Sequence, residues 1–203
     1  MALRSTLGRL QSESTLFLLC DLQDKFRSVA HHIPAIITNA QKLLSSGKQL
    51  DIKLIVTEQY PERLGKTAPE LNVSHAIGVY PKLEFSIMKD EKLKHAIIGL
   101  NNVKSVVLFG LETHICIEQT AMDLLDNDYD VHIVADCTTS RSVEDRCLAF
   151  QRLRQIGCFI TTSENVIFKL LGGKTHPQFS WILPLVSKKS EESGLAGAHF
   201  LDA

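Results

Sequence analysis

The alternation of short apolar runs with longer segments of helical periodicity constrains the fold of this chain more than any other feature. Residues 15–20 form a short apolar run, which is typical of a strand buried on both faces of a parallel sheet. Residues 33–50 then carry apolar side chains three and four positions apart, with Pro34 at the expected first turn of a helix. By the same patterns, strands are expected at 15–20, 52–56, 79–82, 105–109, 130–134 and 158–161, and helices at 33–50, 90–100, 115–125, 143–156, 162–171 and 177–186.

Strands that alternate with helices of this length predict βαβ units with right-handed crossovers. The expected fold is therefore α/β, a three-layer αβα arrangement with a mostly parallel, Rossmann-like sheet of about six strands. A chain of 203 residues without an internal repeat or a linker favours one domain. We expect this domain at 15–187, preceded by an N-terminal extension at 1–14 and followed by a C-terminal tail at 188–203.

The charge balance limits the classes of partner. The chain has 22 Lys and Arg residues against 23 Asp and Glu residues, a net charge of −1, whereas bulk electrostatic binding to nucleic acid or an anionic membrane needs a basic excess. Its apolar runs are far shorter than the roughly 20 residues of a membrane span. Glycine-rich phosphate-binding motifs are also missing from the sequence. We therefore expect a small-molecule substrate, with neither a nucleic acid nor a membrane as partner.

The cysteines bear on the cellular compartment. The five cysteines include no C-x-x-C pair, and this pattern is typical of reduced thiols in a reducing compartment, which predicts a cytoplasmic location. The first residues offer one alternative. Arg4 and Arg9 precede the first acidic residue, Glu13, as in a mitochondrial presequence, so a mitochondrial location stays open.

Side chains at the carboxyl ends of the expected strands are the candidates for a site, because ligands of open α/β sheets bind there. The first strand delivers a carboxylate, the third a lysine and the fourth a cysteine, so these three groups are expected at the same edge of the sheet. The residues expected at the strand ends are Asp21, Gln59, Tyr60, Lys82, Glu112, His114, Cys116 and Cys137.

Cys116 is the candidate nucleophile. It lies at the start of the helix expected from residue 115, where unpaired N–H groups and the helix dipole favour a thiolate. A nearby lysine would add to this effect, and a carboxylate could accept the thiol proton. The backbone N–H groups of residues 112–116 could face a developing oxyanion. This combination predicts cysteine-based hydrolysis of an amide or related bond, and the alternative is a buried structural cysteine.

The other cysteines are expected in different surroundings. Cys20 and Cys158 fall in apolar strands and Cys147 lies at helical spacing from apolar neighbours, so all three are expected in the core. Cys137 is expected either in the core or at the lining of the site.

Two segments carry a resemblance to a known family. Residues 21–26 match D-x-Q-x-x-F and residues 110–121 match G-x-x-T-x-x-C-x-x-x-T-A, the motifs of the isochorismatase-like cysteine hydrolases. Residues 131–136, followed by Ser140 and Arg141, resemble the next strand and turn of that family. The segments 57–61 and 176–179 are most similar to the eukaryotic isochorismatase domain-containing proteins.

The resemblance implies a role for each candidate. Asp21 would be the base, Lys82 would hold the thiolate and orient Asp21, and Cys116 would attack. The oxyanion hole would consist of the N–H groups of Cys116 and Glu112, with a cis peptide bond between Leu111 and Glu112. Specificity would come from side chains around the site, and the protein would be a homo-oligomer. The expected substrate pocket comprises Gln59, Tyr60, Phe85, Glu112 and His114.

Two departures from the family's patterns refine the expected activity. The nicotinamidases of the family bind a metal through an Asp-x-His segment after the second strand, whereas residues 58–63 here contain no histidine. We therefore expect no metal, no cofactor and no nicotinamidase activity. Family members that cleave isochorismate often lack the cysteine, so Cys116 indicates a small amide, carbamoyl or related substrate and a thioester intermediate. The alternative is a non-catalytic protein that keeps the fold and site and acts by binding a partner or by sensing oxidants.

Overall fold

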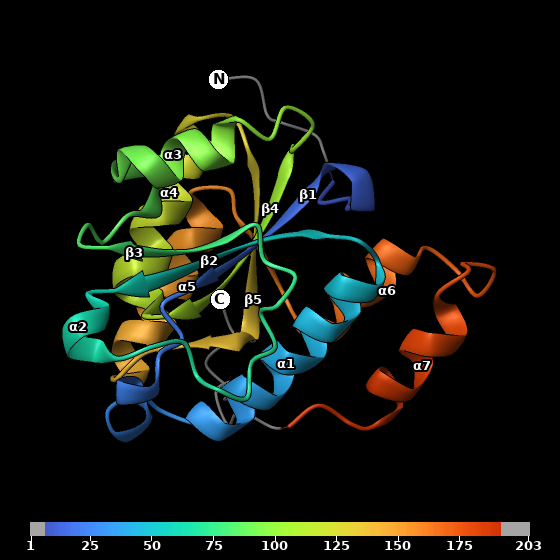
Figure 1. Ribbon diagram of the computed structural model, residues 1–203, viewed down its shortest axis with the longest axis horizontal. Coiled ribbons are helices and arrows are strands. Elements are labelled where there is room, and N and C mark those ends of the chain that lie inside the picture. Colours follow the sequence, from blue (N-terminus) through green and yellow to red (C-terminus); the bar gives the residue numbers. More distant parts are fainter. Residues whose placement is uncertain (1–6, 192–203) are drawn as a thin grey trace.

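The computed structural model describes residues 7–191, which form a six-stranded sheet between two layers of helices (Figure 1). Every pair of neighbouring strands is parallel, so the predicted α/β fold with a Rossmann-like sheet is confirmed. The strand order is β3-β2-β1-β4-β5-β6. The strands are β1 (Thr15–Cys20), β2 (Lys53–Gln59), β3 (Gly78–Lys82), β4 (Ser105–Leu111), β5 (Asp130–Thr139) and β6 (Phe159–Thr161).

The helices cover both faces of the sheet. Alternate side chains of β1 point to opposite faces, so that Phe17 and Leu19 pack on one side with α1, α6 and α7, whereas Leu16 and Leu18 pack on the other side with α3, α4 and α5. The α-helices are α1 (Ile33–Gln49), α2 (Pro61–Leu64), α3 (Glu91–Ile98), α4 (Glu118–Asp126), α5 (Val143–Gln155), α6 (Ser163–Leu171) and α7 (Phe179–Ser187). Short 3₁₀ turns lie at Ser12–Ser14, Asp24–Ser28 and Ile87–Lys89, and a π-helical turn, Thr113–Ile117, leads into α4.

Several boundaries differ from the sequence-based expectations. β2, β4 and β5 continue past the expected ends of their strands, because the residues at their carboxyl ends still pair with neighbouring strands. Cys137, which was expected just past a strand, therefore lies inside β5 and is buried in the core. Cys147 was expected in the core but is only half-buried. The short helix α2 lies between the strands expected at 52–56 and 79–82, where the sequence predicted no helix.

The ends of the chain bear on three further expectations. Residues 1–6 and 192–203 lie outside the described residues, so part of the expected N-terminal extension and most of the expected tail are not described. No helix in the described part of the chain is long and apolar enough to cross a membrane.

The topology brings two strand ends together at the middle of the sheet. From β1 the chain moves outward through β2 to β3 and then returns to form β4 on the other side of β1. The strand order reverses at this point, and ligands of doubly wound folds bind in the crevice outside such strand ends. The residues that follow β1 and β4 are therefore the ones the fold places in the position of a ligand site.

Gly110 allows β4 to approach β1 closely at this point. It pairs with Cys20 in the β1–β4 register and has a φ of +123°, a backbone conformation that side chains disfavour. A Cβ atom at position 110 would lie 1.9 Å from the carbonyl oxygen of Cys20. A glycine is therefore required here for the two strand ends to meet.

We expect Gly110→Ala to lower the free energy of unfolding by about 3 kcal/mol or more, because the new Cβ combines backbone strain with a clash against rigid backbone. Urea denaturation measures this. The matched control is Gly172→Ala, where φ is also positive at +66° but nothing lies within 4 Å of the new Cβ, and this variant should lose only about 1–2 kcal/mol. Equal losses in the two variants would contradict the close approach at Gly110.

Candidate active site

Asp21, Lys82 and Cys116 lie together at the carboxyl edge of the sheet. Asp21 follows β1, Lys82 ends β3 and Cys116 lies in the π-helical turn after β4. The Nζ atom of Lys82 is 2.7 Å from Oδ2 of Asp21 and 3.7 Å from Sγ of Cys116. Since β2 separates β1 from β3, the long lysine side chain spans the end of β2 to reach the other two groups. All three residues are buried.

The carboxylate of Asp21 is fixed by two neighbours. The Thr57 hydroxyl donates a hydrogen bond of 2.7 Å to its Oδ1 atom, and the Lys82 ammonium pairs with its Oδ2 atom. The backbone N–H of Asp21 also donates to the carbonyl of Thr57 at 3.1 Å. A buried charge is stable only where it is paired and hydrogen-bonded, and these contacts satisfy that requirement.

The ammonium of Lys82 is surrounded by acceptors. Besides Asp21 it donates to the Oε1 atom of Gln59 at 2.5 Å and to the carbonyl of Glu84 at 3.1 Å. Burial alone would lower the pKa of Lys82, but electrostatic interactions with the side chains of Cys20, Asp21 and Cys116 outweigh it and raise that pKa. Lys82 is therefore cationic at neutral pH, and its charge lies beside the sulfur of Cys116.

The turn before Cys116 is anchored at Glu112. The peptide bond between Leu111 and Glu112 is cis, as the resemblance implied, and the Glu112 carbonyl accepts hydrogen bonds from the N–H groups of Ile115 and Ile117. The Glu112 carboxylate is buried and pairs with Arg141, which contacts it through its backbone N–H at 2.9 Å and its guanidinium at 2.5 Å. Burial would raise the pKa of Glu112, but the hydrogen bonds from Arg141 prevail and lower it.

The residues expected in the substrate pocket occupy different places. The side chain of Gln59 contacts Lys82 directly, and Phe85 contacts it through its carbonyl while its ring is exposed. Tyr60 is exposed, with the guanidinium of Arg63 above its ring. The ring of His114 contacts Ser140 at 3.0 Å and Asp145 at 3.7 Å. Gln59 thus contacts the Asp21–Lys82–Cys116 group directly, whereas Tyr60, Glu112 and His114 use their side chains to contact residues outside that group.

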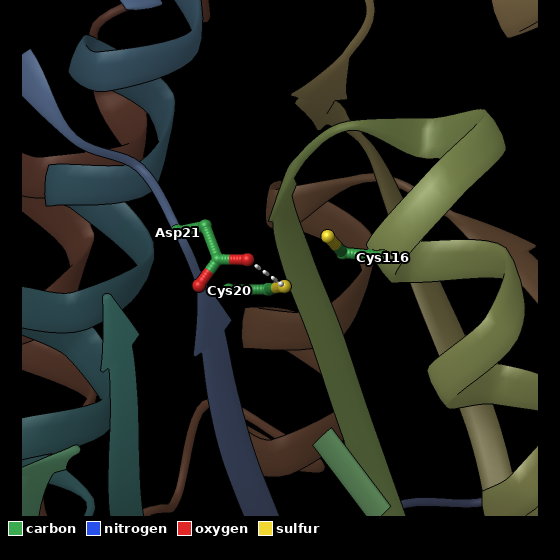
Figure 2. Close-up of side chains that lie close together, drawn as sticks. All are labelled: Cys20, Asp21 and Cys116. Carbon is green, nitrogen blue, oxygen red and sulfur yellow. Dashed lines mark hydrogen bonds between the residues drawn. The ribbon is translucent and has the colours of Figure 1, made fainter. Parts of the chain in front are cut away.

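Cys20 also belongs to the site, although the sequence predicted only that it lies in the core. It is buried as expected, but its sulfur, a carboxylate oxygen of Asp21 and the sulfur of Cys116 all lie within 4.8 Å of one another (Figure 2). Its thiol donates to Oδ2 of Asp21 at 3.4 Å and to the carbonyl of Leu111 at 3.4 Å. The sequence feature that could have indicated this role is the position of Cys20 as the last residue of the strand, directly before Asp21.

The two sulfurs and the carboxylate oxygen are also atoms that could bind a metal ion. Within residues 7–191, the ligand atoms close enough to share an ion are those of Cys20, Asp21 and Cys116. Two sulfurs suit a soft cation, but the Lys82 ammonium lies 2.7 Å from the same carboxylate and would repel it. Glu58, in the segment where the resemblance placed the metal ligands of the nicotinamidases, accepts hydrogen bonds from Thr67. The donor set therefore fits proton transfer better than metal binding.

Known proteins are similar in sequence to this chain over nearly its whole length. The isochorismatase domain matches residues 15–165. The isochorismatase domain-containing protein 1 of Danio rerio is 44% identical over 191 residues, which is 94% of this chain and 67% of that protein. The isochorismatase domain-containing protein 2 of Bos taurus is 43% identical over 196 residues, which is 97% of this chain and 94% of that protein.

A solved structure agrees with these sequence relatives. It is described as the MAR1 ribonuclease of Caenorhabditis elegans, and it covers 93% of this chain and 97% of its own chain, with a TM-score of 0.86 and 37% identity. The resemblance that the two motifs predicted is thereby confirmed, together with the fold.

The pair of Glu112 and Arg141 can be tested by a double-mutant cycle. We expect Arg141→Met to lower the free energy of unfolding by about 1–2 kcal/mol at neutral pH, because it leaves the buried carboxylate of Glu112 unpaired. This figure allows for solvent screening, since 59% of the Arg141 side chain is exposed. In the Glu112→Gln background the same change should cost almost nothing.

The pH dependence of this cost follows from the lowered pKa of folded Glu112. The cost of Arg141→Met should be fully present above the pKa of the unfolded carboxyl group and should disappear as the pH falls through the lowered pKa of the folded protein. Urea denaturation at neutral and acidic pH measures both effects. A cost that is independent of pH and of residue 112 would show that the ion pair is not responsible.

Proposed function

The chain belongs to the isochorismatase family, and from this premise we propose that it is a metal-free cysteine hydrolase of a small amide, carbamoyl or related substrate. The observation that carries the proposal is the convergence of Asp21, Lys82 and Cys116, with Lys82 Nζ 2.7 Å from the carboxylate and 3.7 Å from the thiol sulfur. Base, cation and nucleophile are the groups that this chemistry requires.

In the first half of the proposed reaction, Asp21 accepts the thiol proton of Cys116 and Lys82 stabilises the thiolate. The sulfur attacks the substrate carbonyl carbon, and the N–H groups of Glu112 and Cys116 donate to the resulting oxyanion. The tetrahedral intermediate then collapses, the bond to the leaving amine breaks, and Asp21 returns its proton to that amine. A thioester on Cys116 remains.

In the second half, water cleaves the thioester. Asp21, again a carboxylate, accepts a proton from the water molecule as it attacks the thioester carbonyl. The same N–H groups stabilise the second oxyanion, and the acid product leaves as the sulfur of Cys116 recovers its proton. The cycle uses one acid–base group twice, which is consistent with the fixed position of Asp21 between Thr57 and Lys82.

Burial of the reacting groups supports a small substrate. Asp21 and Lys82 are almost inaccessible and Cys116 is 6% exposed, and the net charge of −1 gives no general attraction for a polyanion. The Caenorhabditis elegans neighbour is described as a ribonuclease, so RNA is the competing substrate class. Incubating this protein with RNA in parallel with small amides separates the two classes.

The edge strand β3 supports the proposal of a homo-oligomer. Ile77, Val79, Leu83 and Phe85, which lie on it and beside it, are large apolar side chains exposed to solvent. In an interface with a second copy of the chain, these side chains would be buried away from water, and that interface would lie next to the site.

Sedimentation analysis tests this interface. We expect the wild-type protein to sediment as a multiple of its 22.6 kDa chain mass, and we expect Leu83→Glu to shift it toward the monomer, because a charge would be buried in the interface. The control is Leu148→Glu, a change at an exposed leucine on α5, which should leave the mass unchanged. A monomeric wild-type protein at micromolar concentration would contradict the interface.

The assignment of the nucleophile is tested with Cys116→Ala and a panel of small amides. Hydrolysis should fall by at least roughly 10³-fold, because the covalent route is lost, and iodoacetamide should label Cys116 first. Cys158 is a matched control, since it is 5% exposed against 6% for Cys116 and burial raises its pKa to about 12. Equal labelling of the two cysteines, or full activity in Cys116→Ala, would show that Cys116 is not the nucleophile.

A further inference from the structure

We propose that Cys20 and Cys116 form a reversible oxidative modification site, in which a hydroperoxide oxidises Cys116 and Cys20 then closes a disulfide bond with it. The inference rests on the proposed function in one respect, namely that Cys116 is the reactive thiol of the site. It goes beyond that function, because the hydrolysis proposed above leaves Cys20 without a role.

The two thiols face each other across the point where β1 and β4 end. Figure 2 shows both sulfurs near the end of β4, with Asp21 beside Cys20. The two sulfurs lie within 4.8 Å of each other, and a disulfide bond is about 2.0 Å long. Closing it needs a side-chain adjustment of a few ångströms at most.

The surroundings assign different roles to the two sulfurs. Burial raises the pKa of Cys20 well above its usual value, and the neighbouring Cys116 and Asp21 add to this effect. Cys20 is therefore a neutral thiol at neutral pH. Cys116 instead accepts a hydrogen bond from the Lys82 ammonium, and it is the more exposed of the two. Cys116 is thus the sulfur that attacks the oxidant, and Cys20 is the sulfur that resolves the product.

Asp21 is placed to assist the resolving step. Its Oδ2 atom accepts a hydrogen bond of 3.4 Å from the Cys20 thiol, so the carboxylate can take the thiol proton as the sulfur attacks. Cys137, by contrast, packs on the opposite face of the sheet and donates to Asp136. The structure thereby distinguishes Cys20 from the remaining thiols as the partner of Cys116.

The oxidation needs no reactant other than the hydroperoxide. The Cys116 thiolate attacks one oxygen of the hydroperoxide, the O–O bond breaks, and the leaving oxygen takes a proton to give an alcohol, or water from hydrogen peroxide. Cys116 has then lost two electrons and is a sulfenic acid. Cys20 gives its proton to Asp21 and attacks the Cys116 sulfur, the S–O bond breaks, and the hydroxyl leaves as water with that proton.

The consequence is a hydrolase that oxidation inactivates reversibly. The disulfide removes the nucleophile, and it also prevents further oxidation of Cys116 to the irreversible sulfinic acid. A dithiol reductant restores both thiols by exchange.

The test is peptide mapping of the full-length protein after treatment with stoichiometric hydrogen peroxide. Cleavage after glutamate releases residues 113–118, in which Cys116 is the sole cysteine, and residues 14–58, in which Cys20 is the sole cysteine. We expect these two peptides to be joined, with the mass of the intact protein about 2 Da lower, and we expect dithiothreitol to separate them and restore hydrolysis.

Two variants complete the test. In Cys20→Ala the joined peptides should be lost and Cys116 should accumulate as sulfinic acid, with activity that dithiothreitol no longer restores. In Cys137→Ala, which removes an equally buried thiol, the joined peptides should form as in the wild type. Since the linkage is measured in the wild-type protein, the test does not depend on whether Cys20→Ala folds.

The outcomes separate this inference from the proposed function. If Cys116 is labelled rapidly by iodoacetamide but peroxide yields only its sulfenic or sulfinic acid in the wild type, or a linkage to Cys137, the disulfide proposal is wrong and the hydrolase proposal stands. If iodoacetamide labels Cys116 no faster than Cys158 and peroxide leaves it unchanged, both are wrong.

Discussion

The buried ion pair of Lys82 and Asp21 is the interaction on which the rest of the site depends. Both side chains are 1% exposed or less and their charged atoms are 2.7 Å apart. Neither charge would be tolerated alone in such a position, so each has further partners, Thr57 for the carboxylate and Gln59 for the ammonium. The pair in turn sets the electrostatic surroundings of Cys116, because the cation that neutralises Asp21 also donates to the thiol sulfur.

The parallel sheet makes this arrangement possible. Reversal of the strand order at β1 brings residues that are far apart in the sequence to one edge. The lysine enters from β3, two strands away from β1, and the cysteine enters from the turn after β4. Gly110 allows β4 to lie against Cys20 at the centre of this edge. The same close approach places the second thiol beside the first, so that the proposed catalytic and oxidative chemistry share one origin in the fold.

The fold and the candidate residues could be predicted because their signals are local. Apolar runs located all six strands, and the rule that ligands bind at strand ends selected Asp21, Lys82 and Cys116. Contacts between elements could not be predicted in this way. The extension of β5 to Thr139 depends on pairing with β4, which hydrophobicity does not report. The apolar pattern of β1 correctly indicated a buried Cys20, but burial alone does not tell which atoms a thiol contacts.

In the proposed mechanism, the Asp21–Lys82 pair makes Cys116 a covalent nucleophile. It is tested most directly by mass spectrometry of the protein quenched during turnover of an amide that it hydrolyses, with Lys82→Met as the comparison. We expect an acyl adduct on Cys116 in the wild type that is lost when the cation is removed. An adduct on another residue, or one that forms equally well in Lys82→Met, would contradict it.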